Sequence, residues 1–470
     1  MRKTKIICTI GPASQNKETL TAMCKAGMNV ARMNFSHGTY PEQQAKMDLV
    51  KEVRQELGLP IAIMLDTKGP EYRIRTFKDG KITLNEGDTF IFTTDEVEGD
   101  QTRVSVNYKK LTENLNVGDR ILVNNGLVVC EVTAIEGASI VTKVLSGGVL
   151  SDRKSMSFPN KVMSGPYLSE QDKQDLLFGI QNEVDFVAAS FVSSKSDMQE
   201  LRSFLNANGG GNIELIAKIE NRSGVDNIEE ICELADGVMI ARGDLGVEIP
   251  FVEVPAIQKR LTSTCRMLGK RVITATEMLE SMIQNPRPTR AEISDVANAV
   301  YDGSSAVMLS GESAAGKHPV EAVKTMADIC EFTEQHTSYQ KRFYKADFRI
   351  RNTLDAVSHA VCAMAIDVGA KGIVVCSVSG TTARMVSRFR CPVDIIGMTT
   401  DERIYRRLSL SWGVTPVLAE EFTSQDVMFF HAMSSAKQVL HLEKGDRVVL
   451  TGGPINGKTG NTNTIKVETV

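Results

Sequence analysis

The 470-residue sequence predicts an α/β protein: a (β/α)8 TIM barrel with an inserted small β-barrel lid domain and a C-terminal open α/β domain. Three observations predict it. Short apolar runs alternate with amphipathic helical patterns, one internal stretch changes to period-two strands, and a second α/β pattern follows the last barrel strand. The expected domains are 1–69 with 167–340 for the barrel, 70–166 for the lid and 341–470 for the C-terminal domain.

Eight apolar runs are candidates for the barrel strands. They are 6–10, 29–35, 61–66, 184–191, 213–219, 237–241, 271–276 and 305–309. Each is followed by a stretch of helical pattern, which is typical of βα units in a parallel sheet. Eight such units predict a closed barrel.

The two other domains differ from the barrel in how apolar and polar residues are spaced along the sequence. Between about 78 and 150 the segments DGKITL, EGDTFIF, VGDRILV and NNGLVVCEV alternate apolar and polar residues and are separated by turn residues, which predicts antiparallel strands. The C-terminal region has a helical pattern over 353–367 and apolar strands over 372–376 and 447–450. Trp412, the only tryptophan, is expected in its core.

Composition excludes several classes of protein. Lys and Arg total 54 against 58 Asp and Glu, a net charge of −4, and no basic cluster predicts nucleic-acid binding. No apolar run approaches the ~18 residues of a membrane span. The nine cysteines include no C-x-x-C pair, and the N-terminal apolar run 6–10 is too short for a secretory signal, so we expect a cytoplasmic protein.

Polar residues gather at the carboxyl ends of the expected barrel strands, where barrel enzymes place their active sites. They are Thr9, Arg32, Asn34, Ser36, His37, Asp66, Thr67, Lys68, Ser190, Lys218, Glu220, Arg242, Asp244, Thr276, Ser310 and Glu312. Helix capping explains any one Ser, Thr or Asp among them. It explains Lys218 poorly, because this charge follows the apolar run IELIA and would be buried without a purpose.

Two carboxylates, Glu220 and Asp244, end successive strands and should face one site. With no His or Cys beside them they favour Mg²⁺ or Mn²⁺, although structural salt bridges are a commoner use of such pairs. The glycines of RGDLG (242–246) would let backbone N–H groups approach an anion. Together with Arg32 and Lys218, these groups predict a site for a small, multiply anionic molecule.

Seven segments in this order resemble the motifs of the pyruvate kinase family. They are NFSHG (34–38), LDTKGPE (65–71), AKIEN (217–221), ARGDLGVE (241–248), ATEMLESM (275–282), PTRAE (288–292) and MLSGE (308–312). The resemblance implies a glycolytic phosphotransferase that moves the phosphoryl group of phosphoenolpyruvate to ADP, giving ATP and pyruvate, and then protonates the enolate.

The resemblance also implies roles for individual residues. Those of the catalytic set are Arg32, Arg73, Lys218, Thr276, Ser310 and Glu312. Those of the substrate site are Ser190, Ala241, Arg242, Gly243, Asp244 and Thr276. Those near the nucleotide are Arg32, His37, Arg73 and Lys154. Mg²⁺ or Mn²⁺ would bind Glu220 and Asp244, and K⁺ would bind Asn34, Ser36, Asp66 and Thr67.

Some positions refine or depart from the family pattern. Glu71 stands where family members that need K⁺ tend to carry Glu, which predicts K⁺ dependence. Glu277 replaces a more usual Gln. Asn124 and Asn125 replace two Asp of the lid, and Asn160 replaces the Gly of a Leu-Pro-Gly segment. These departures concern contacts of the lid and the surroundings of Thr276.

The C-terminal domain resembles the regulatory domain of the family. Hydroxyls, a glycine and the start of a helical pattern after the strand 372–376 can hold a phosphate. The implied residues for a phosphorylated allosteric effector are Ser377, Ser379, Gly380, Thr381 and Thr382, and the segment 457–464 resembles a loop that covers it. A capped βα turn without a ligand is the alternative. The resemblance further implies a homotetramer with 288–298 near an interface between barrels, or simply a helix start there.

Two other functions remain open at this stage. One is a Mg²⁺-dependent lyase or aldolase that handles pyruvate enolate, which should lack Arg32, Lys218 and the lid. The other is a non-catalytic metabolite sensor, against which the intact Lys218, Glu220, Asp244 and Thr276 argue.

Overall fold

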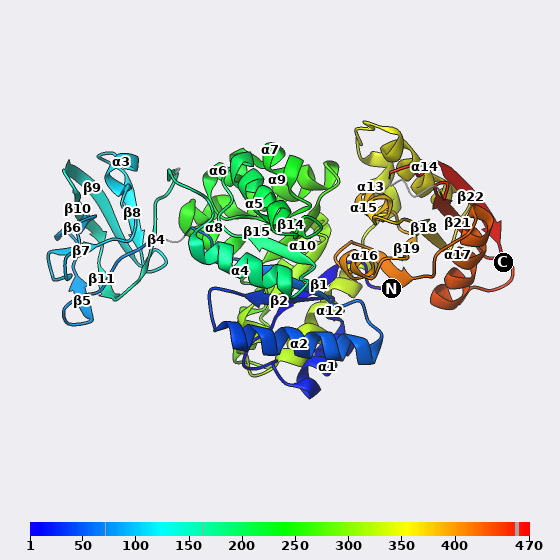
Figure 1. Ribbon diagram of the computed structural model, residues 1–470, viewed down its shortest axis with the longest axis horizontal. Coiled ribbons are helices and arrows are strands. Elements are labelled where there is room, and N and C mark those ends of the chain that lie inside the picture. The colour runs from blue at the N-terminus through cyan, green and yellow to red at the C-terminus, as the bar shows by residue number, and fades with distance from the viewer. Residues whose placement is uncertain (71, 162, 456–459) are drawn as a thin grey trace.

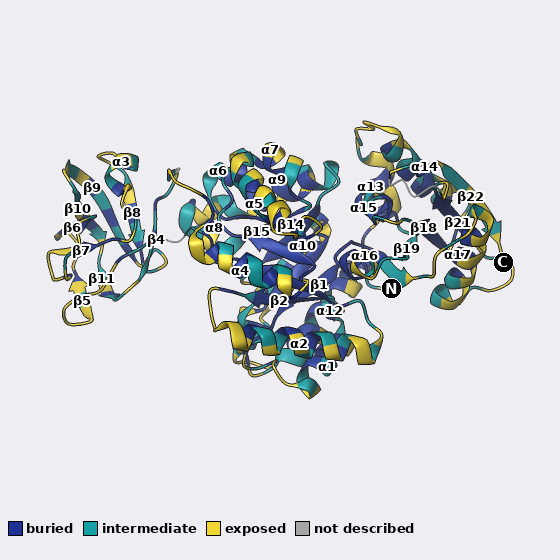
Figure 2. Ribbon diagram, in the orientation of Figure 1, coloured by how far each residue is buried: buried dark blue, intermediate teal, exposed yellow. Residues whose placement is uncertain are grey.

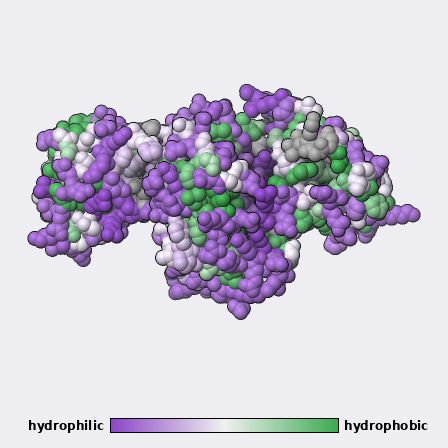
Figure 3. Space-filling view, in the orientation of Figure 1, coloured by the Kyte–Doolittle hydropathy of each residue, from purple (hydrophilic) through white to green (hydrophobic). Residues whose placement is uncertain are grey.

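The computed structural model describes the whole chain except residues 71, 162 and 456–459. Three bodies lie in a row, with the barrel in the middle, the lid at one end and the C-terminal domain at the other (Figure 1). The surface drawn in Figure 3 is mainly hydrophilic, with separate hydrophobic patches. Within the described residues, no helix is both long and apolar enough to cross a membrane.

The barrel is closed by eight parallel strands, as the sequence predicts. Their order around the barrel is β1-β17-β16-β15-β14-β13-β3-β2. The strands are β1 (Lys5–Thr9), β2 (Val30–Asn34), β3 (Ala62–Asp66), β13 (Phe186–Ala189), β14 (Glu214–Ile219), β15 (Gly237–Ala241), β16 (Arg271–Ala275) and β17 (Ala306–Leu309). Nearly every strand residue is buried, because side chains fill the barrel interior on one face and meet the helices on the other (Figure 2).

Helices cover the outside of the barrel. They are α1 (Lys17–Ala26), α2 (Tyr40–Leu57), α4 (Glu170–Gln181), α5 (Lys195–Ala207), α6 (Arg222–Asp226), α7 (Ile228–Leu234), α8 (Arg242–Glu248), η1 (Phe251–Glu253), α9 (Val254–Met267), η2 (Glu280–Ile283), α10 (Arg290–Asp302), α11 (Gly311–Ala314) and α12 (Pro319–Gln335). Capping boxes start several of them, such as Ser194 with Asp197 at α5 and Thr289 with Glu292 at α10. These caps fix where each loop ends, at the same edge of the barrel as the polar strand ends.

The lid is an all-β insertion between β3 and α4. Its elements are β4 (Tyr72–Arg73), β5 (Lys81–Leu84), β6 (Thr89–Thr93), β7 (Arg103–Ser105), α3 (Leu111–Asn114), β8 (Arg120–Val123), β9 (Val128–Glu136), β10 (Ser139–Ser146), β11 (Gly148–Ser151) and β12 (Ser155–Ser157). Seven of the strands form one sheet in the order β4-β12-β8-β9-β10-β6-β7. A bridge between Ile74 and Val106 joins the two edges of that sheet, which closes it around a core containing Phe90 and Phe92.

The C-terminal domain is an open α/β sheet. Its elements are α13 (Tyr339–Lys345), α14 (Thr353–Asp367), β18 (Gly372–Cys376), α15 (Thr381–Arg388), β19 (Asp394–Thr399), α16 (Glu402–Leu408), β20 (Val414–Leu418), α17 (Gln425–Leu440), β21 (Arg447–Gly452) and β22 (Thr464–Thr469). The strand order is β20-β19-β18-β21-β22, and only β22 runs antiparallel to its neighbour. Trp412 is buried, as expected.

Candidate active site

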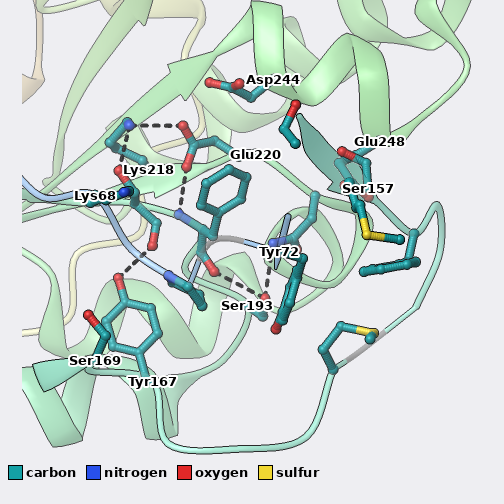
Figure 4. A pocket seen from close by; sticks show the side chains of 18 of the residues that line it. Lys68, Tyr72, Ser157, Tyr167, Ser169, Ser193, Lys218, Glu220, Asp244 and Glu248 are labelled. Atoms are coloured by element: carbon teal, nitrogen blue, oxygen red, sulfur yellow. Dashed lines mark hydrogen bonds and ion pairs between the residues drawn. The ribbon is translucent and has the colours of Figure 1, made fainter. Parts of the chain in front are cut away.

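A cleft of about 710 Å³ lies between the carboxyl ends of the barrel strands and the lid. The sequence-predicted residues that line it are Arg32, Asn34, Ser36, His37, Asp66, Arg73, Ser190, Lys218, Glu220 and Asp244. Figure 4 shows Lys218, Glu220 and Asp244 lying near one another in this cleft. The strand ends therefore converge as the barrel topology predicts.

Asp66 joins the two buried cations of the cleft. Its Oδ2 accepts a hydrogen bond from Arg32 Nε at 2.6 Å, and its Oδ1 lies 3.1 Å from Lys218 Nζ. Lys218 Nζ also donates to Ser190 Oγ at 2.6 Å and lies 2.9 Å from Glu220 Oε1. Arg32 Nη1 donates to the hydroxyl of Thr9 at 2.8 Å. Two cations held by buried carboxylates give a fixed cluster of paired charges beside the cleft.

The pKa shifts of these groups follow from burial and from their partners. Burial alone would lower the pKa of Lys218, but Asp66 and Glu220 outweigh it and raise the pKa above its ordinary value. Burial opposes ionisation of Asp66 too, yet Arg32 and Lys218 bring the pKa of Asp66 below its usual range. Lys218 and Asp66 are therefore both charged at neutral pH.

Glu220 and Asp244 meet the chemical requirements of a divalent cation site. Glu220 is 1% exposed, and its Oε2 accepts the backbone N–H of Phe191 at 2.5 Å. Its Oε1 is buried and forms an ion pair with Lys218 Nζ at 2.9 Å. Burial, reinforced by Asp244, raises the pKa of Glu220 to about 7, although Lys218 opposes this. A cation between the two carboxylates would relieve that destabilised charge.

The number of protein ligands leaves room for a substrate. In the described part of the chain, no group of three or more His, Cys, Asp and Glu side chains could hold a metal. Two carboxylates would thus hold an ion such as Mg²⁺ with most of its positions free for water or substrate oxygens. Hard oxygen ligands fit Mg²⁺ or Mn²⁺ rather than zinc.

Ser190 connects the cation cluster to the barrel backbone. Its hydroxyl, which accepts from Lys218, lies 2.7 Å from the carbonyl of Thr67 and 3.3 Å from Asp66 Oδ1. Its backbone N–H donates to Thr67 Oγ1 at 3.1 Å, and its carbonyl accepts from Tyr167 at 2.7 Å. These contacts fix the side chain to which Lys218 donates.

The residues around Thr276 form a second group, at the ends of β15, β16 and β17. The N–H of Gly243 donates to Thr276 Oγ1 at 2.8 Å, which in turn donates to the carbonyl of Ala275 at 2.6 Å. Arg242 points away from the cleft and binds Asp295 and the carbonyl of Thr276 at 2.7 Å each. Thr276 has a φ of +66°, which is strained for a β-branched residue and typical of a functional site.

Ser310 and Glu312 belong to the same region. Glu312 is buried and accepts the backbone N–H groups of Ser310 at 2.7 Å and Leu279 at 3.0 Å. The hydroxyl of Ser310 is buried and has no hydrogen-bond partner among the residues that the structure describes. An unpaired buried hydroxyl of this kind is open to a water or a substrate group.

The oxygen donors predicted for K⁺ lie at the ends of β2 and β3. Asn34 Oδ1 accepts the N–H of Ser36 at 3.0 Å, and Asp66 and Thr67 take part in the cluster described above. Glu71, on which the K⁺ prediction partly depends, lies outside the described residues. The donor set is all oxygen, as K⁺ requires.

Of the residues expected near the nucleotide, all but Lys154 line the cleft. His37 is exposed and lines the cleft, as does Arg73, whose Nη1 donates to the carbonyl of Arg153 at 2.5 Å. Lys154 is not among the described residues that line the cleft. Its carbonyl accepts the N–H of Ile74 instead.

The C-terminal domain has a pocket of about 330 Å³ at the predicted effector loop. Ser377, Ser379 and Thr382 line it, and Gly380 has a left-handed φ of +72° just before α15. Thr382 Oγ1 lies 2.8 Å from Thr462 Oγ1, which ties the loop to the segment after β21. Thr381 contacts Ser379 at 3.0 Å. The segment 457–464 was expected to cover the effector. Its residues 457–459 lie outside the described part of the chain.

Lys68, Tyr72 and Glu248 also line the cleft. Lys68 is one of the polar strand-end residues expected there, whereas Tyr72 and Glu248 were assigned no role from the sequence. The signal for Lys68 is its place two residues after the end of β3. Glu248 ends α8, four residues after Asp244, so the sequence could have predicted that both lie on one face of the same helix. Tyr72 packs edge-on against Tyr108 and Phe158 at the root of the lid, which no local pattern predicts.

Fold and site together define a barrel enzyme whose cleft, at the carboxyl ends of the strands, is lined by charged side chains of both signs. Residues 1–323 match the pyruvate kinase barrel domain, and residues 355–468 match the pyruvate kinase alpha/beta domain. The chain belongs to the pyruvate kinase family.

Individual relatives agree with this assignment. The chain is 45% identical to a pyruvate kinase of Clostridium acetobutylicum over the full length of both. It is 47% identical to one of Geobacillus stearothermophilus, with all of this chain and 80% of the relative covered. A crystal structure of a pyruvate kinase from Cryptosporidium parvum superposes with a TM-score of 0.95 at 36% identity, covering 100% of this chain and 96% of that one.

The family fixes the overall reaction. The chain is a pyruvate kinase enzyme, a glycolytic transferase that uses phosphoenolpyruvate and ADP and forms pyruvate. The lyase and sensor alternatives are thereby set aside.

Proposed function

We propose that Arg32, Lys218 and a divalent ion on Glu220 and Asp244 carry the phosphoryl transfer. The observation that supports this most strongly is Lys218, a buried cation between Asp66 and Glu220 at the edge of the cleft. A migrating phosphoryl group spreads its charge over three oxygens, and fixed positive groups stabilise that charge. Because Asp66 already holds both cations in place, little reorganisation is needed when the charge develops.

The divalent ion, when bound, would supply further positive charge to the carboxylate and phosphate oxygens of the substrate. The chain's own residues orient the reactants. Ser190 holds the ammonium of Lys218, and Arg73 and His37 line the cleft where the phosphates of the nucleotide would lie. The backbone of 241–244, of which Asp244 lines the cleft, is the proposed site of the substrate carboxylate. Lys154, the remaining residue expected near the nucleotide, is not among the described residues that line the cleft and would have to approach the nucleotide from outside it.

We assign enolate protonation to the group around Thr276. Its hydroxyl accepts from the N–H of Gly243, in the proposed substrate-binding segment, and donates to the carbonyl of Ala275, so its position is fixed. We propose that this hydroxyl, with a water, delivers the proton to the enolate carbon. Ser310, whose backbone N–H donates to Glu312, has a buried hydroxyl with no partner among the described residues, which supports a water beside it. Asn34, Ser36, Asp66 and Thr67 are the proposed K⁺ ligands.

Regulation by a phosphorylated effector is proposed for the C-terminal pocket. The helix α15 starts at the loop 377–380 and carries Arg384 one turn later. Arg384 Nη1 lies 3.2 Å from Glu214 Oε1 and 3.4 Å from Asp236 Oδ1, at the starts of β14 and β15. These two strands lead to Glu220 and Asp244. Phosphate binding at the N-terminus of α15 would therefore act on the barrel through Arg384.

The remaining proposals concern organisation. We propose the domain boundaries 1–69 with 167–340, 70–166 and 341–470, a homotetramer in which 288–298 lies near the contact between barrels, and a cytoplasmic location. Sedimentation of the purified chain tests the tetramer.

The central test is pyruvate formation from phosphoenolpyruvate, coupled to an indicator dehydrogenase. ADP, the divalent ion and K⁺ are omitted in turn, and sugar phosphates or nucleotides are then added. Turnover that requires all three supports both proposed ion sites. Turnover that is indifferent to divalent ions contradicts the site on Glu220 and Asp244.

A further inference from the structure

The lid contacts two segments of the barrel. Each of these segments also carries one of the proposed metal ligands, a few residues before the contact. Arg222 Nε, in α6, donates to Oδ1 of the lid residue Asn160 at 3.4 Å. Glu248, at the end of α8, lies beside Ser157 of the lid (Figure 4). Arg222 follows Glu220 by two residues, and Glu248 follows Asp244 by four. Each proposed metal ligand thus has a lid contact on its own segment.

Glu248 interacts with two lid groups at the wall of the cleft. Burial raises the pKa of its carboxyl to about 7, while the hydroxyl of Ser157 and the backbone N–H of Phe158 oppose that rise. The neighbouring Val247 lies against the lid as well, since a Cβ added to Gly126 would stand 3.8 Å from Val247 Cγ1. The end of α8 is therefore packed and hydrogen-bonded by the lid.

Arg222 also connects the two metal-bearing segments to each other. Its Nη2 donates to Oε2 of Glu253 at 2.7 Å, and Glu253 lies in η1, directly after α8. The guanidinium therefore bridges Asn160 of the lid, the segment after β14 and the segment after β15. A planar group with several donors suits such a bridge.

Asn160 contributes a side chain that its backbone does not require. Its φ is +62°, a conformation that glycine adopts freely and asparagine adopts more readily than most residues. Glycine would fit the turn without strain but would lack the amide oxygen that Arg222 contacts. The asparagine adds a contact between lid and barrel.

We propose that Arg222 and Glu248 are positioning residues through which the docked lid holds the segments of Glu220 and Asp244 in register for the metal and the substrate. This inference rests on the proposed metal site. Neither residue needs to touch the substrate. Their effect is that of outer contacts that orient metal ligands.

The test compares Asn160→Gly, Arg222→Gln, their double variant, and Glu248→Ala with Glu248→Gln. We expect the activation constant for Mn²⁺ and the KM for phosphoenolpyruvate to rise about tenfold in Glu248→Ala and Arg222→Gln. Glu248→Gln, which keeps an acceptor oxygen, should recover part of the loss. The double variant should be no worse than Arg222→Gln alone, because both remove the same contact. Asn85→Gly, elsewhere in the lid, is the matched control.

A second readout separates positioning from general damage. Hydrogen exchange of the backbone over 221–227 and 241–248, with Mn²⁺ and phosphoenolpyruvate present, should be faster in the Arg222 and Glu248 variants at unchanged melting temperature. If all variants keep the wild-type activation constant for Mn²⁺, the wild-type KM for phosphoenolpyruvate and the wild-type rate of hydrogen exchange, the inference is wrong, although the proposed metal site is unaffected. A wild-type enzyme that needs no divalent ion would instead contradict the proposed metal site itself.

Discussion

Asp66 Oδ1 lies 3.1 Å from Lys218 Nζ, although the two residues come from strands separated by the whole lid in sequence. The same carboxylate holds Arg32, so one buried anion sets the place of both cations. In a buried site, each cation would be poorly stabilised without that anion. The proposed phosphoryl-transfer centre is therefore held in place before substrate arrives.

Lys218→Met should reduce pyruvate formation at least about 1000-fold, because it removes a positive group from the migrating phosphoryl. Exchange of the methyl protons of added pyruvate should continue, since that step depends on Thr276 and the metal. Both are measured on one preparation, by the coupled assay and by deuterium incorporation. Lys195→Met, on an exposed lysine of α5, is the control. Surviving phosphoryl transfer in Lys218→Met would refute the assigned role.

The affinity for Mn²⁺ should decrease as the pH is lowered below about 7. The carboxyl of Glu220 must lose its proton to bind the ion, and burial raises its pKa to about 7 in the absence of metal. Each pH unit below that value should therefore weaken Mn²⁺ binding about tenfold, measured by calorimetric titration without substrate. Glu220→Gln should bind weakly at every pH. A flat pH profile in the wild-type protein would contradict the shift.

The same shift predicts the pH dependence of stability. A carboxyl with a raised folded pKa favours the folded state while protonated, so Glu220 stabilises the metal-free protein at low pH and loses that contribution as pH rises through about 7. Bound Mg²⁺ should remove the loss. Thermal unfolding at pH 6 and 8, with and without Mg²⁺, measures this: the stabilisation by Mg²⁺ should be larger at about pH 8 than at about pH 6.

The sequence predicted the barrel well because its strands are continuous buried runs, which have a strong local pattern. The sequence also predicts a function for Lys218, because a charge after the apolar run IELIA would otherwise be buried without a purpose; that function stays a prediction. It could not predict that Asp66 pairs with Lys218. That contact depends on the register of β3, β13 and β14, where Asp66 lies opposite Ala188, and Ala188 lies opposite Ile216. Register between strands distant in sequence leaves no local pattern.

The contacts between the lid and the barrel could not be predicted from the sequence either. Asn160 could be recognised as a departure from a family pattern, but its partner Arg222 lies 62 residues away. The left-handed backbone of Thr276 was also unpredictable, because β-branched residues rarely adopt it. Strain of this kind is maintained by tertiary contacts, here the hydrogen bonds from Arg242 to its carbonyl.

Thr276→Val should slow proton exchange of pyruvate more than Thr276→Ser does. Valine keeps the branched shape but has no hydroxyl to accept from Gly243 or to donate, whereas serine keeps both functions. We expect a loss of about 100-fold in exchange for valine and less than about tenfold for serine. Equal rates in the two variants would show that the hydroxyl is not part of the proton relay.

Arg384→Met should disconnect the C-terminal pocket from the active site. Arg384 joins α15 to Glu214 and Asp236, while Glu214 keeps its second partner, Arg271, at 2.6 Å, so the barrel itself should remain folded. The basal rate should stay within about twofold, but activation by a phosphorylated effector should fall toward none, since a ligand acts only through contacts that differ between states. The measurement is the ratio of KM for phosphoenolpyruvate without and with effector. Arg403→Met, which removes an exposed arginine of α16, should keep the wild-type ratio. If Arg384→Met keeps that ratio too, the coupling does not pass through this ion pair.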